Sequence, residues 1–180
     1  DGKDGLKLYQ YNKNNQRVRE ALATTSVYSV ASGYANSDSA KTHSYDASGN
    51  LVQTVDANGF ITTRYYDKDQ RMVAMLDADN VLHEYDFDAF GQRVAERMFM
   101  TRLAVEAHDP AQRPQAPAGD VRNYRFEFDL MGHQTRKVYP QVTLTSLTNA
   151  DGSHPAASSN LVTPEERTVF DAWGNAIEAV

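Results

Sequence analysis

The strongest constraint on the fold is an eight-residue phrase that recurs at a fixed interval. It reads YDASGNLV from Tyr45, YDKDQRMV from Tyr66 and FDAFGQRV from Phe87, so each copy begins 21 residues after the one before. A fixed period of this length indicates that one supersecondary unit is stacked repeatedly. The sequence therefore predicts a repeat array.

The same pattern can be aligned six times along the chain. It consists of an aromatic residue, Asp or Asn, two variable residues, Gly or a substitute, two more residues and usually an aliphatic one. The copies begin at Tyr11, Tyr45, Tyr66, Phe87, Phe128 and Phe170. Weaker echoes lie between the strong copies, in VDANGFIT and LDADNVLH. The predicted unit therefore contains two turns and two strands.

The turn tetrapeptides predict how the strands are connected. DANG, DKDQ, DADN and DAFG suit tight reversals, because Asp accepts backbone N–H bonds and Gly or Asn tolerates a positive φ. Short reversals make neighbouring strands antiparallel. We therefore expect an all-β fold, an antiparallel β-meander with strands at 51–55, 60–66, 71–76, 81–87 and 92 to about 100.

The alternation of side chains predicts the two faces of this sheet. Neither face is cleanly apolar, so we expect one side to be covered and the other partly covered. The aromatic residues that open the phrases, Tyr45, Tyr66 and Phe87, are expected to stack as a column along the sheet. The regular part of the array is predicted to span residues 42–96.

Three stretches interrupt the period and are predicted to be irregular inserts, at about 20–44, 101–122 and 140–166. The first is expected to hold an extra strand at 24–31. The second contains a Pro- and Ala-rich surface loop at 107–120. The third begins with an alternating strand at 141–147 and continues as a hairpin tip and linker, with one helical turn after Thr163-Pro164.

The composition excludes several classes of function. The net charge of −6 and the pI near 5.3 leave no basic stripe that could follow a phosphate backbone, so no nucleic-acid partner is expected. No apolar run is long enough to span a membrane, and DGKDGLKLYQ lacks the apolar region of a signal peptide. The absence of cysteine removes disulfides, thiol nucleophiles and thiolate metal sites.

The aspartates of the turns have two interpretations. Clustered carboxylates can bind calcium, but here they come one or two to a turn, without the long Asp-rich loop that ends in Glu. Capping of the turns by Asp46, Asp67 and Asp88 is the favoured interpretation, and a calcium site is the alternative.

Other candidate chemistries have less support in the sequence. Five histidines are scattered without the paired spacing of a zinc site, at His43, His83, His108, His133 and His154. His108 precedes Asp-Pro and is interpreted as part of a turn. Ser48 and Ser153 lie beside glycine, as turn residues do, and no Gly-x-Ser-x-Gly motif is present. We therefore assign no catalytic, cofactor-binding or metal-binding residue, while acid and base pairs formed in space stay open.

Two aromatic residues, Phe90 and Trp173, occupy the same position within their turns. Each is the third residue of an Asp-led tetrapeptide, DAFG and DAWG. Packing against the neighbouring turn is the favoured interpretation, and binding of a sugar or of a partner surface is the alternative.

The segments YDASGNLV, TTRYYDKDQRMV and HEYDFDAFGQRVAE together resemble the RHS repeat, also called the YD repeat. The sequence departs from the pattern at Asn12, Asn15 and Gln70 and in the two long spacers. The resemblance implies a long β-strip that winds spirally into a hollow shell. In relatives such a shell encloses a toxic C-terminal domain or forms a large extracellular barrel, and similar arrays occur in giant bacterial surface proteins.

This resemblance implies a structural rather than an enzymatic function. The leading hypothesis is part of a shell that encapsulates a toxin payload in a secreted bacterial protein. The alternative is an adhesin or fibre segment of a bacterial surface protein that binds glycans or another cell. Both place the chain outside the cell. Residues 1–180 are expected to be an array from a longer chain, which pairs through its sheet edges with the remainder of that chain or with neighbouring copies.

Overall fold

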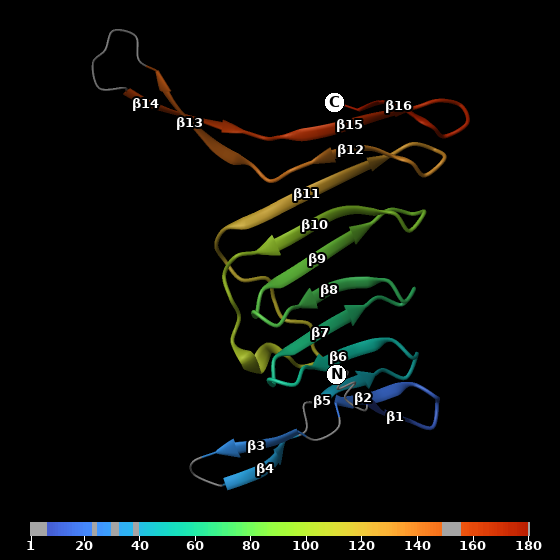
Figure 1. Ribbon diagram of the computed structural model, residues 1–180. Helices are drawn as coiled ribbons and strands as arrows, with labels where there is room; N and C mark the ends of the chain where they lie inside the picture. The colour runs from blue at the N-terminus through green and yellow to red at the C-terminus, as the bar shows by residue number, and fades with distance from the viewer. Residues whose placement is uncertain (1–6, 23–24, 30–32, 38–39, 149–155, 180) are drawn as a thin grey trace, which may run out of the picture. The chain divides into compact units, whose positions relative to one another are not determined.

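The computed structural model describes residues 7–22, 25–29, 33–37, 40–148 and 156–179 (Figure 1). Within these residues there are sixteen strands and a single short 3-10 turn, η1 (Val105–Ala107). Each strand pair whose register is described is antiparallel, from β1 with β2 to β15 with β16. The predicted antiparallel all-β meander is confirmed.

The chain divides into two compact units. The first contains residues 1–82 and 102–117, and the second contains residues 83–101 and 118–180. The first unit therefore takes in the Pro- and Ala-rich stretch that leaves the meander after β10 and returns before β11.

The first unit is built on six strands, each hydrogen-bonded to the next. They are β1 (Lys7–Tyr11), β2 (Arg17–Leu22), β5 (Ala40–Tyr45), β6 (Leu51–Val55), β7 (Ile61–Tyr66) and β8 (Met72–Leu76). A separate hairpin, β3 (Thr25–Ser29) with β4 (Gly33–Ser37), is inserted between β2 and β5. The strand expected at 24–31 is thus half of a hairpin, and β4 was not foreseen.

The second unit is also built on six strands. They are β9 (Leu82–Phe87), β10 (Arg93–Phe99), β11 (Val121–Phe128), β12 (Gln134–Val138), β15 (Glu165–Phe170) and β16 (Ala176–Ala179). A second inserted hairpin, β13 (Val142–Thr148) with β14 (Ala156–Val162), lies in sequence between β12 and β15. In both units the inserted hairpin forms a sheet of its own, so the main meander continues past it.

Two expectations for the third insert are wrong. The stretch expected to be a linker contains β14, although residues 149–155 of the expected hairpin tip lie outside the described residues. The helical turn expected after Pro164 is instead the start of β15, where Glu165 pairs with Val138 of β12. Arg136 of β12 binds the Glu165 carboxylate with its Nε at 3.0 Å, which favours the strand over a local helical turn.

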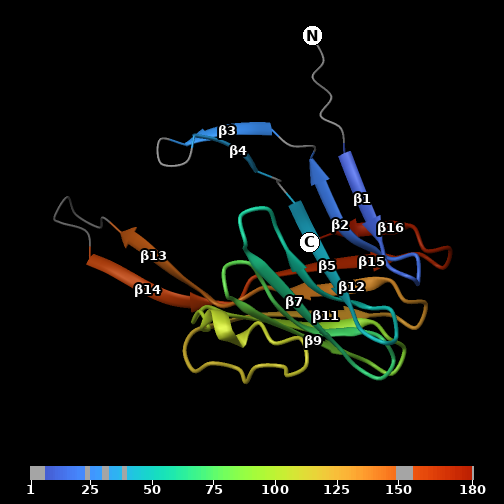
Figure 2. The same cartoon turned by 90° about the horizontal axis from the view of Figure 1, so that it is seen from below.

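The first unit buries one face of its sheet. Thr63, Tyr65, Ala74 and Leu76 are buried, and the register places Thr63 opposite Leu76 and Tyr65 opposite Ala74. The residues that alternate with them along β7 and β8 are half-buried. The expectation of one covered and one partly covered face is therefore confirmed for this unit. Figures 1 and 2 show the segment around η1 beside β7, and this segment provides the cover.

Candidate functional site: a ladder of capped turns and an anchored loop

Eight turns of the array share one hydrogen-bonding scheme. In each, the backbone N–H of the leading Asp or Asn donates to the carbonyl four residues later, and the N–H three residues later donates back. The leading residues are Asn12, Asp46, Asp56, Asp67, Asp77, Asp88, Asp129 and Asp171. The half-period echoes thus form the same turn as the strong copies.

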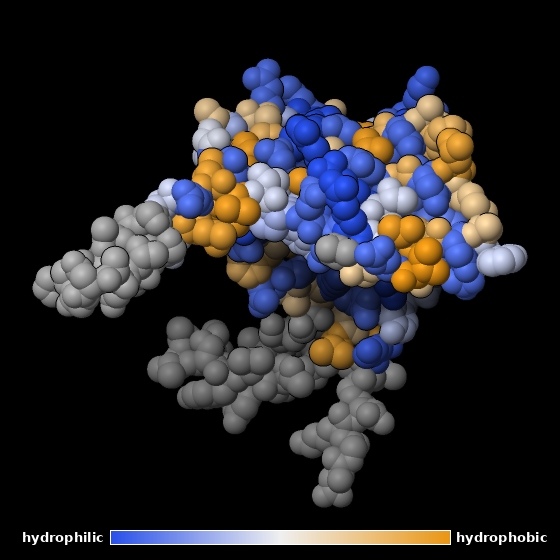
Figure 3. Space-filling view, turned by 90° about the horizontal axis from the view of Figure 1, so that it is seen from above, coloured by the Kyte–Doolittle hydropathy of each residue, from blue (hydrophilic) through white to orange (hydrophobic). Residues whose placement is uncertain are grey.

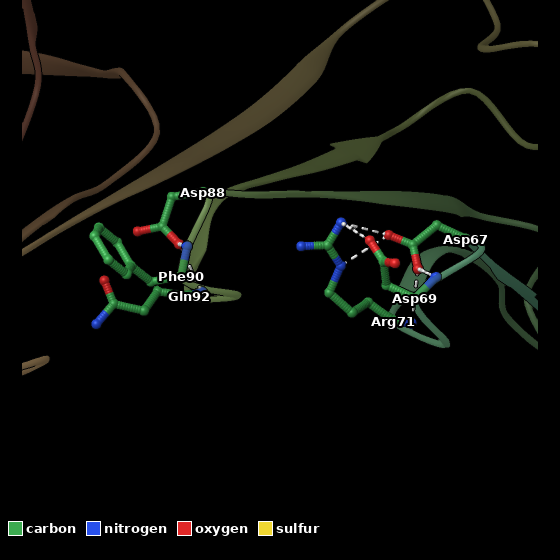
Figure 4. A network of polar contacts seen from close by, with 6 residues as sticks. All are labelled: Asp67, Asp69, Arg71, Asp88, Phe90 and Gln92. Carbon is green, nitrogen blue, oxygen red and sulfur yellow. Dashed lines mark hydrogen bonds and ion pairs between the residues drawn. The ribbon is translucent and has the colours of Figure 1, made fainter.

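The leading side chain completes each turn. At Asp88, Oδ1 accepts the N–H of Phe90 at 2.9 Å and the N–H of Gln92 at 2.9 Å. Asp67 accepts the N–H groups of Asp69 and Arg71 in the same way, and its Oδ2 accepts the Arg71 Nε at 2.8 Å (Figure 4). The predicted capping by aspartate is confirmed, because these carboxylate oxygens satisfy backbone donors that the reversal leaves without strand partners.

The fourth residue of every turn has a left-handed backbone. Glycine fills this position in five turns, and Asn15, Gln70 and Asn80 fill it in three with φ of 59°, 61° and 63°. Five of the eight turns are preceded by a register shift at the aromatic residue, which indicates a bulge next to the turn. The departures from Gly noted in the sequence therefore keep the same geometry.

Successive turns on one side of the sheet touch one another through the residue that follows the left-handed position. In the first unit, Gln16 Nε2 donates to the Gly49 carbonyl at 3.3 Å. In the second unit, a Cβ on Gly132 would lie 3.1 Å from Gln92 Nε2, and a Cβ on Gly174 would lie 2.9 Å from His133 Nε2. Glycine at these positions therefore provides both the positive φ and the room for the preceding turn.

The repeat aromatic residues also connect neighbouring hairpins. Tyr45 donates its hydroxyl hydrogen to the Arg17 carbonyl at 2.9 Å, and Tyr66 donates to the Leu51 carbonyl at 3.1 Å. Both acceptors lie six residues after the aromatic residue of the preceding copy. Phe87 has no hydroxyl, so it cannot make this bond. The stacked column of rings stays a prediction.

The covering loop, residues 102–117, is fixed to the rest of the first unit by polar contacts. Gln53 Nε2 donates to the His108 carbonyl at 2.9 Å, and Tyr65 donates its hydroxyl hydrogen to the Asp109 carbonyl at 3.0 Å. The Leu103 N–H donates to the carbonyl of Asn80 at 2.9 Å. The stretch expected to be a surface loop is therefore the cover of β6 and β7.

His108 lies at the centre of this contact, with 8% of its surface exposed. Its Nδ1 lies 3.0 Å from Thr63 Oγ1 and its Nε2 lies 2.9 Å from Asn80 Oδ1. Since the Asn80 oxygen can only accept, Nε2 carries the proton and Nδ1 accepts from the Thr63 hydroxyl. The neutral imidazole thereby has a partner on both nitrogens.

Burial lowers the pKa of His108 below its ordinary value of 6.5, and the nearby Asp77 carboxylate only partly opposes this effect. The shift favours the neutral ring that the two hydrogen bonds require. His108 was interpreted from sequence as a turn residue, and no local pattern marks its role. Its partners lie 28 and 45 residues away in the chain.

A charged cluster is present on β9 and β10 of the second unit. Arg97 binds the Glu84 carboxylate with its Nε at 3.2 Å and the Asp86 carboxylate with its Nη2 at 2.8 Å. The hydrogen bonds to Asp86 are the main cause of a raised pKa for Arg97, which keeps it charged. Glu84 is buried, so this cross-strand pairing stabilises a carboxylate that would otherwise be costly to bury.

The remaining described histidines lie apart from one another, and each has different neighbours. His43 lies beside Thr54, with Nδ1 at 3.4 Å from Oγ1, and burial is the main cause of its lowered pKa. His83 faces Glu96 at 3.9 Å, whereas His133 binds Asp129 at 2.9 Å and stacks on the Phe170 ring at 4.7 Å. His154 and Ser153 lie outside the described residues.

No three His, Asp or Glu side chains gather around a possible metal position in the described part of the chain. Ser48 is an exposed residue in the turn that Asp46 caps, and Asn50 Nδ2 binds the second oxygen of that carboxylate at 2.9 Å. Nor is there a helix among the described residues long and apolar enough to cross a membrane.

The second unit has open grooves, and two of them are located by the residues that line them. One, of about 860 Å³, opens where β11 begins and where Pro140 leads the chain away from β12 into β13. The other, of about 690 Å³, lies between the turn at Phe90 and the turn at Met131. Phe90 and Trp173 are exposed at the tips of their turns, so packing against the neighbouring turn does not bury them.

Comparisons with known proteins find a family match in part of the chain. Residues 45–82 match the family model of the RHS Repeat. No curated protein matches the chain. Among solved structures, the Tc holotoxin pore of Photorhabdus luminescens is 13% identical, over 98% of this chain and 9% of that one, with a TM-score of 0.45.

A complex of TcdB2 and TccC3 is 15% identical, over 97% of this chain and 11% of that one, with a TM-score of 0.25. The chain thus spans about a tenth of the length of these structures. The repeated phrases, the capped turns and the meander all agree with the match at residues 45–82. Residues 45–82 of this chain are thus similar to the RHS Repeat family.

Proposed function

We propose that the chain serves as a structural strip in a shell that encloses a toxin payload, within a secreted or surface-exposed bacterial protein. The observation that carries the proposal is the shared turn scheme, which converts the sequence period into consecutive antiparallel hairpins. In RHS relatives, strips of this kind wind into hollow shells. The proposed role is that of a wall, not of an enzyme.

Several features support a rigid wall. The turn carboxylates are engaged by backbone N–H groups, and the repeat tyrosines bind carbonyls of the preceding hairpin. The strands at either end of the described sheet order, β1 and β16, each have one described neighbour. Edge strands of this kind pair readily with further strands. The proposed partners are therefore other strands of the same protein and an enclosed toxin domain.

A protease-protection experiment on the full-length parent protein tests the proposal. We expect limited proteolysis followed by mass spectrometry to find a protected domain outside the repeat array. A matched parent carrying Asp67→Ala and Asp88→Ala, which weakens two turns, should lose that protection at a lower denaturant concentration. A parent protein whose other domains are cleaved equally fast with or without an intact array would overturn the proposal and favour the adhesin or fibre alternative.

A further inference from the structure

The turns of the second unit present a row of exposed apolar side chains. This tip row consists of Phe90, Leu130, Met131 and Trp173, which are 86%, 102%, 67% and 84% exposed. The side chains come from three separate hairpins, β9–β10, β11–β12 and β15–β16. Monomeric proteins seldom expose contiguous apolar patches above a few hundred Å², and those that do often use them for binding.

The backbone under the tip row is fixed. The N–H groups of Phe90, Met131 and Trp173 each donate at 2.9 Å to the carboxylate that leads their own turn. Gln92 Nε2 lies close beside Gly132 of the next turn, and the His133 ring stacks on Phe170 of the hairpin after it at 4.7 Å. The exposed side chains are therefore presented from an ordered support, and ordering it adds little to the cost of binding.

The equivalent turns of the first unit are polar. Asn14, Ser48 and Asp69 occupy the third turn position that Phe90, Met131 and Trp173 occupy in the second unit, and all three are exposed. The Asp-capped turn thus accepts a polar residue at this position. The apolar residues are consequently not required by the turn itself, and their concentration in one unit needs another explanation.

The spacing of the hairpins restricts what can lie along the row. β10 pairs with β11 and β12 pairs with β15, so the three turns follow one another, as Figures 1 and 2 show. Two strand spacings separate neighbouring tips by roughly 10 Å. An α-helix advances about 10.5 Å in seven residues, whereas a strand repeats one face about every 6.6 Å. A helix therefore matches the row better than a strand.

The charge around the row restricts the occupant further. Asp88, Asp129 and Asp171 lead the three turns, and Glu127 lines the groove between the first two. The Arg136 guanidinium near this groove binds both Glu127 and Glu165, and His133 binds Asp129. The space-filling view of the molecule shows apolar patches set among hydrophilic residues (Figure 3). Acidic flanks favour a basic partner and disfavour an anionic membrane or a second copy of the same row.

We propose that the tip row is a docking surface for a basic amphipathic α-helix of a protein partner. Apolar residues of that helix at i, i+7 and i+14 contact the three tips, and Lys or Arg residues beside them face the turn carboxylates. Aromatic residues and Met are enriched in such interfaces. The assignment does not depend on whether the array encloses a payload.

Fluorescence anisotropy with a labelled helical peptide of about 20 residues tests the proposal. The peptide carries Leu at i, i+7 and i+14 with Lys on both flanks, and a matched peptide carries Glu in place of Lys. We expect Trp173→Ser and Phe90→Ser each to weaken binding of the Lys peptide roughly tenfold. Phe60→Ser, an exposed turn aromatic of the first unit, should leave binding unchanged.

Circular dichroism melting establishes that each variant is folded, and Met131→Ser replaces either of the others if it is not. Equal affinity for the Lys and Glu peptides, or wild-type affinity in the row variants, would overturn the proposal. So would row-dependent binding to neutral phosphatidylcholine vesicles without peptide binding, which would identify a membrane contact. Row-dependent self-association in sedimentation would instead identify a second copy as the occupant, and would also overturn it.

Discussion

At the scale of single residues, the array depends on one carboxylate and one backbone conformation per turn. Asp88 alone satisfies two backbone N–H groups, while the residue three positions later adopts a positive φ. The same two requirements recur in eight turns with different residues between them. Substitutions at these positions therefore isolate each requirement.

Replacement of Asp88 by Ala removes both hydrogen bonds to the turn. We expect the free energy of unfolding to fall by about 1 kcal/mol, the scale of a lost hydrogen bond of this kind. Asp88→Asn is the matched control, because Asn12 caps the first turn with the same contacts, and it should lose less. Urea denaturation measures both. Added calcium should leave the melting temperatures unchanged, and a rise of several degrees would revive the metal alternative.

Substitution of the turn glycines separates backbone strain from steric contact. Gly91 and Gly174 have the same φ of 83°, but only Gly174 has a neighbour, His133, within reach of an added Cβ. Gly91→Ala should cost about 1–2 kcal/mol from strain alone, and Gly174→Ala should cost more. Gln70→Gly should stabilise the chain by about 0.5–1 kcal/mol. Equal costs for the two alanine variants would show that His133 moves aside freely.

At the scale of secondary-structure elements, the loop 102–117 is the cover on which the sheet of the first unit depends. The contact requires a neutral His108, whose pKa is lowered in the folded state by burial. Above the ordinary value of 6.5 the ring is neutral whether the chain is folded or not, so the stabilisation is complete. Below that value the unfolded chain takes up the proton first, and stability falls until the folded pKa is reached.

We therefore expect the free energy of unfolding to decrease as the pH is lowered from 7 through 6.5 toward the lowered folded pKa. His108→Gln should flatten this dependence, and it should cost about 1–3 kcal/mol at pH 7 because buried partners are left unsatisfied. His43→Gln is the comparison variant, because the His43 pKa is also lowered but His43 lies outside the loop contact. It should remove only the part of the pH dependence that His43 itself contributes, and leave the part due to His108. An unchanged pH profile in His108→Gln would contradict this account.

The elements differ in how far their sequence predicts them. The turns at Asp67 and Asp88 were predictable because all their contacts lie within five residues. The start of β15 was not, since its pairing with β12 joins residues 27 to 31 positions apart. The anchoring of the loop was equally hidden, because Thr63 and His108 belong to no repeated pattern. Of the tip row, the sequence singled out only Phe90 and Trp173, and it did not decide whether they pack against a neighbouring turn or bind a partner.

At the scale of the whole molecule, the edges of the sheets decide how the chain associates. β1 is exposed along its whole length, and so is β16. β1 carries Lys7 and β16 carries Glu178 as charged residues, which is little protection against pairing with another strand. We expect the isolated 180-residue chain to associate edge to edge as its concentration rises. Sedimentation velocity measures this, and a stable monomer at high concentration would contradict it.

The position of the covering loop in the sequence has a consequence for synthesis on the ribosome. The hairpins with an Asp- or Asn-led turn each close over a reversal of only four residues, so they can form one after another as the chain emerges. The face of β6 and β7 must nevertheless stay exposed to water until residues 103–109 have appeared, after the three further strands β8, β9 and β10. We expect nascent chains released at residue 100 to be cleaved faster within β6 and β7 than chains released at residue 120. The first unit would then assemble in two stages: its strands pair first, and the face of β6 and β7 is shielded from water afterwards.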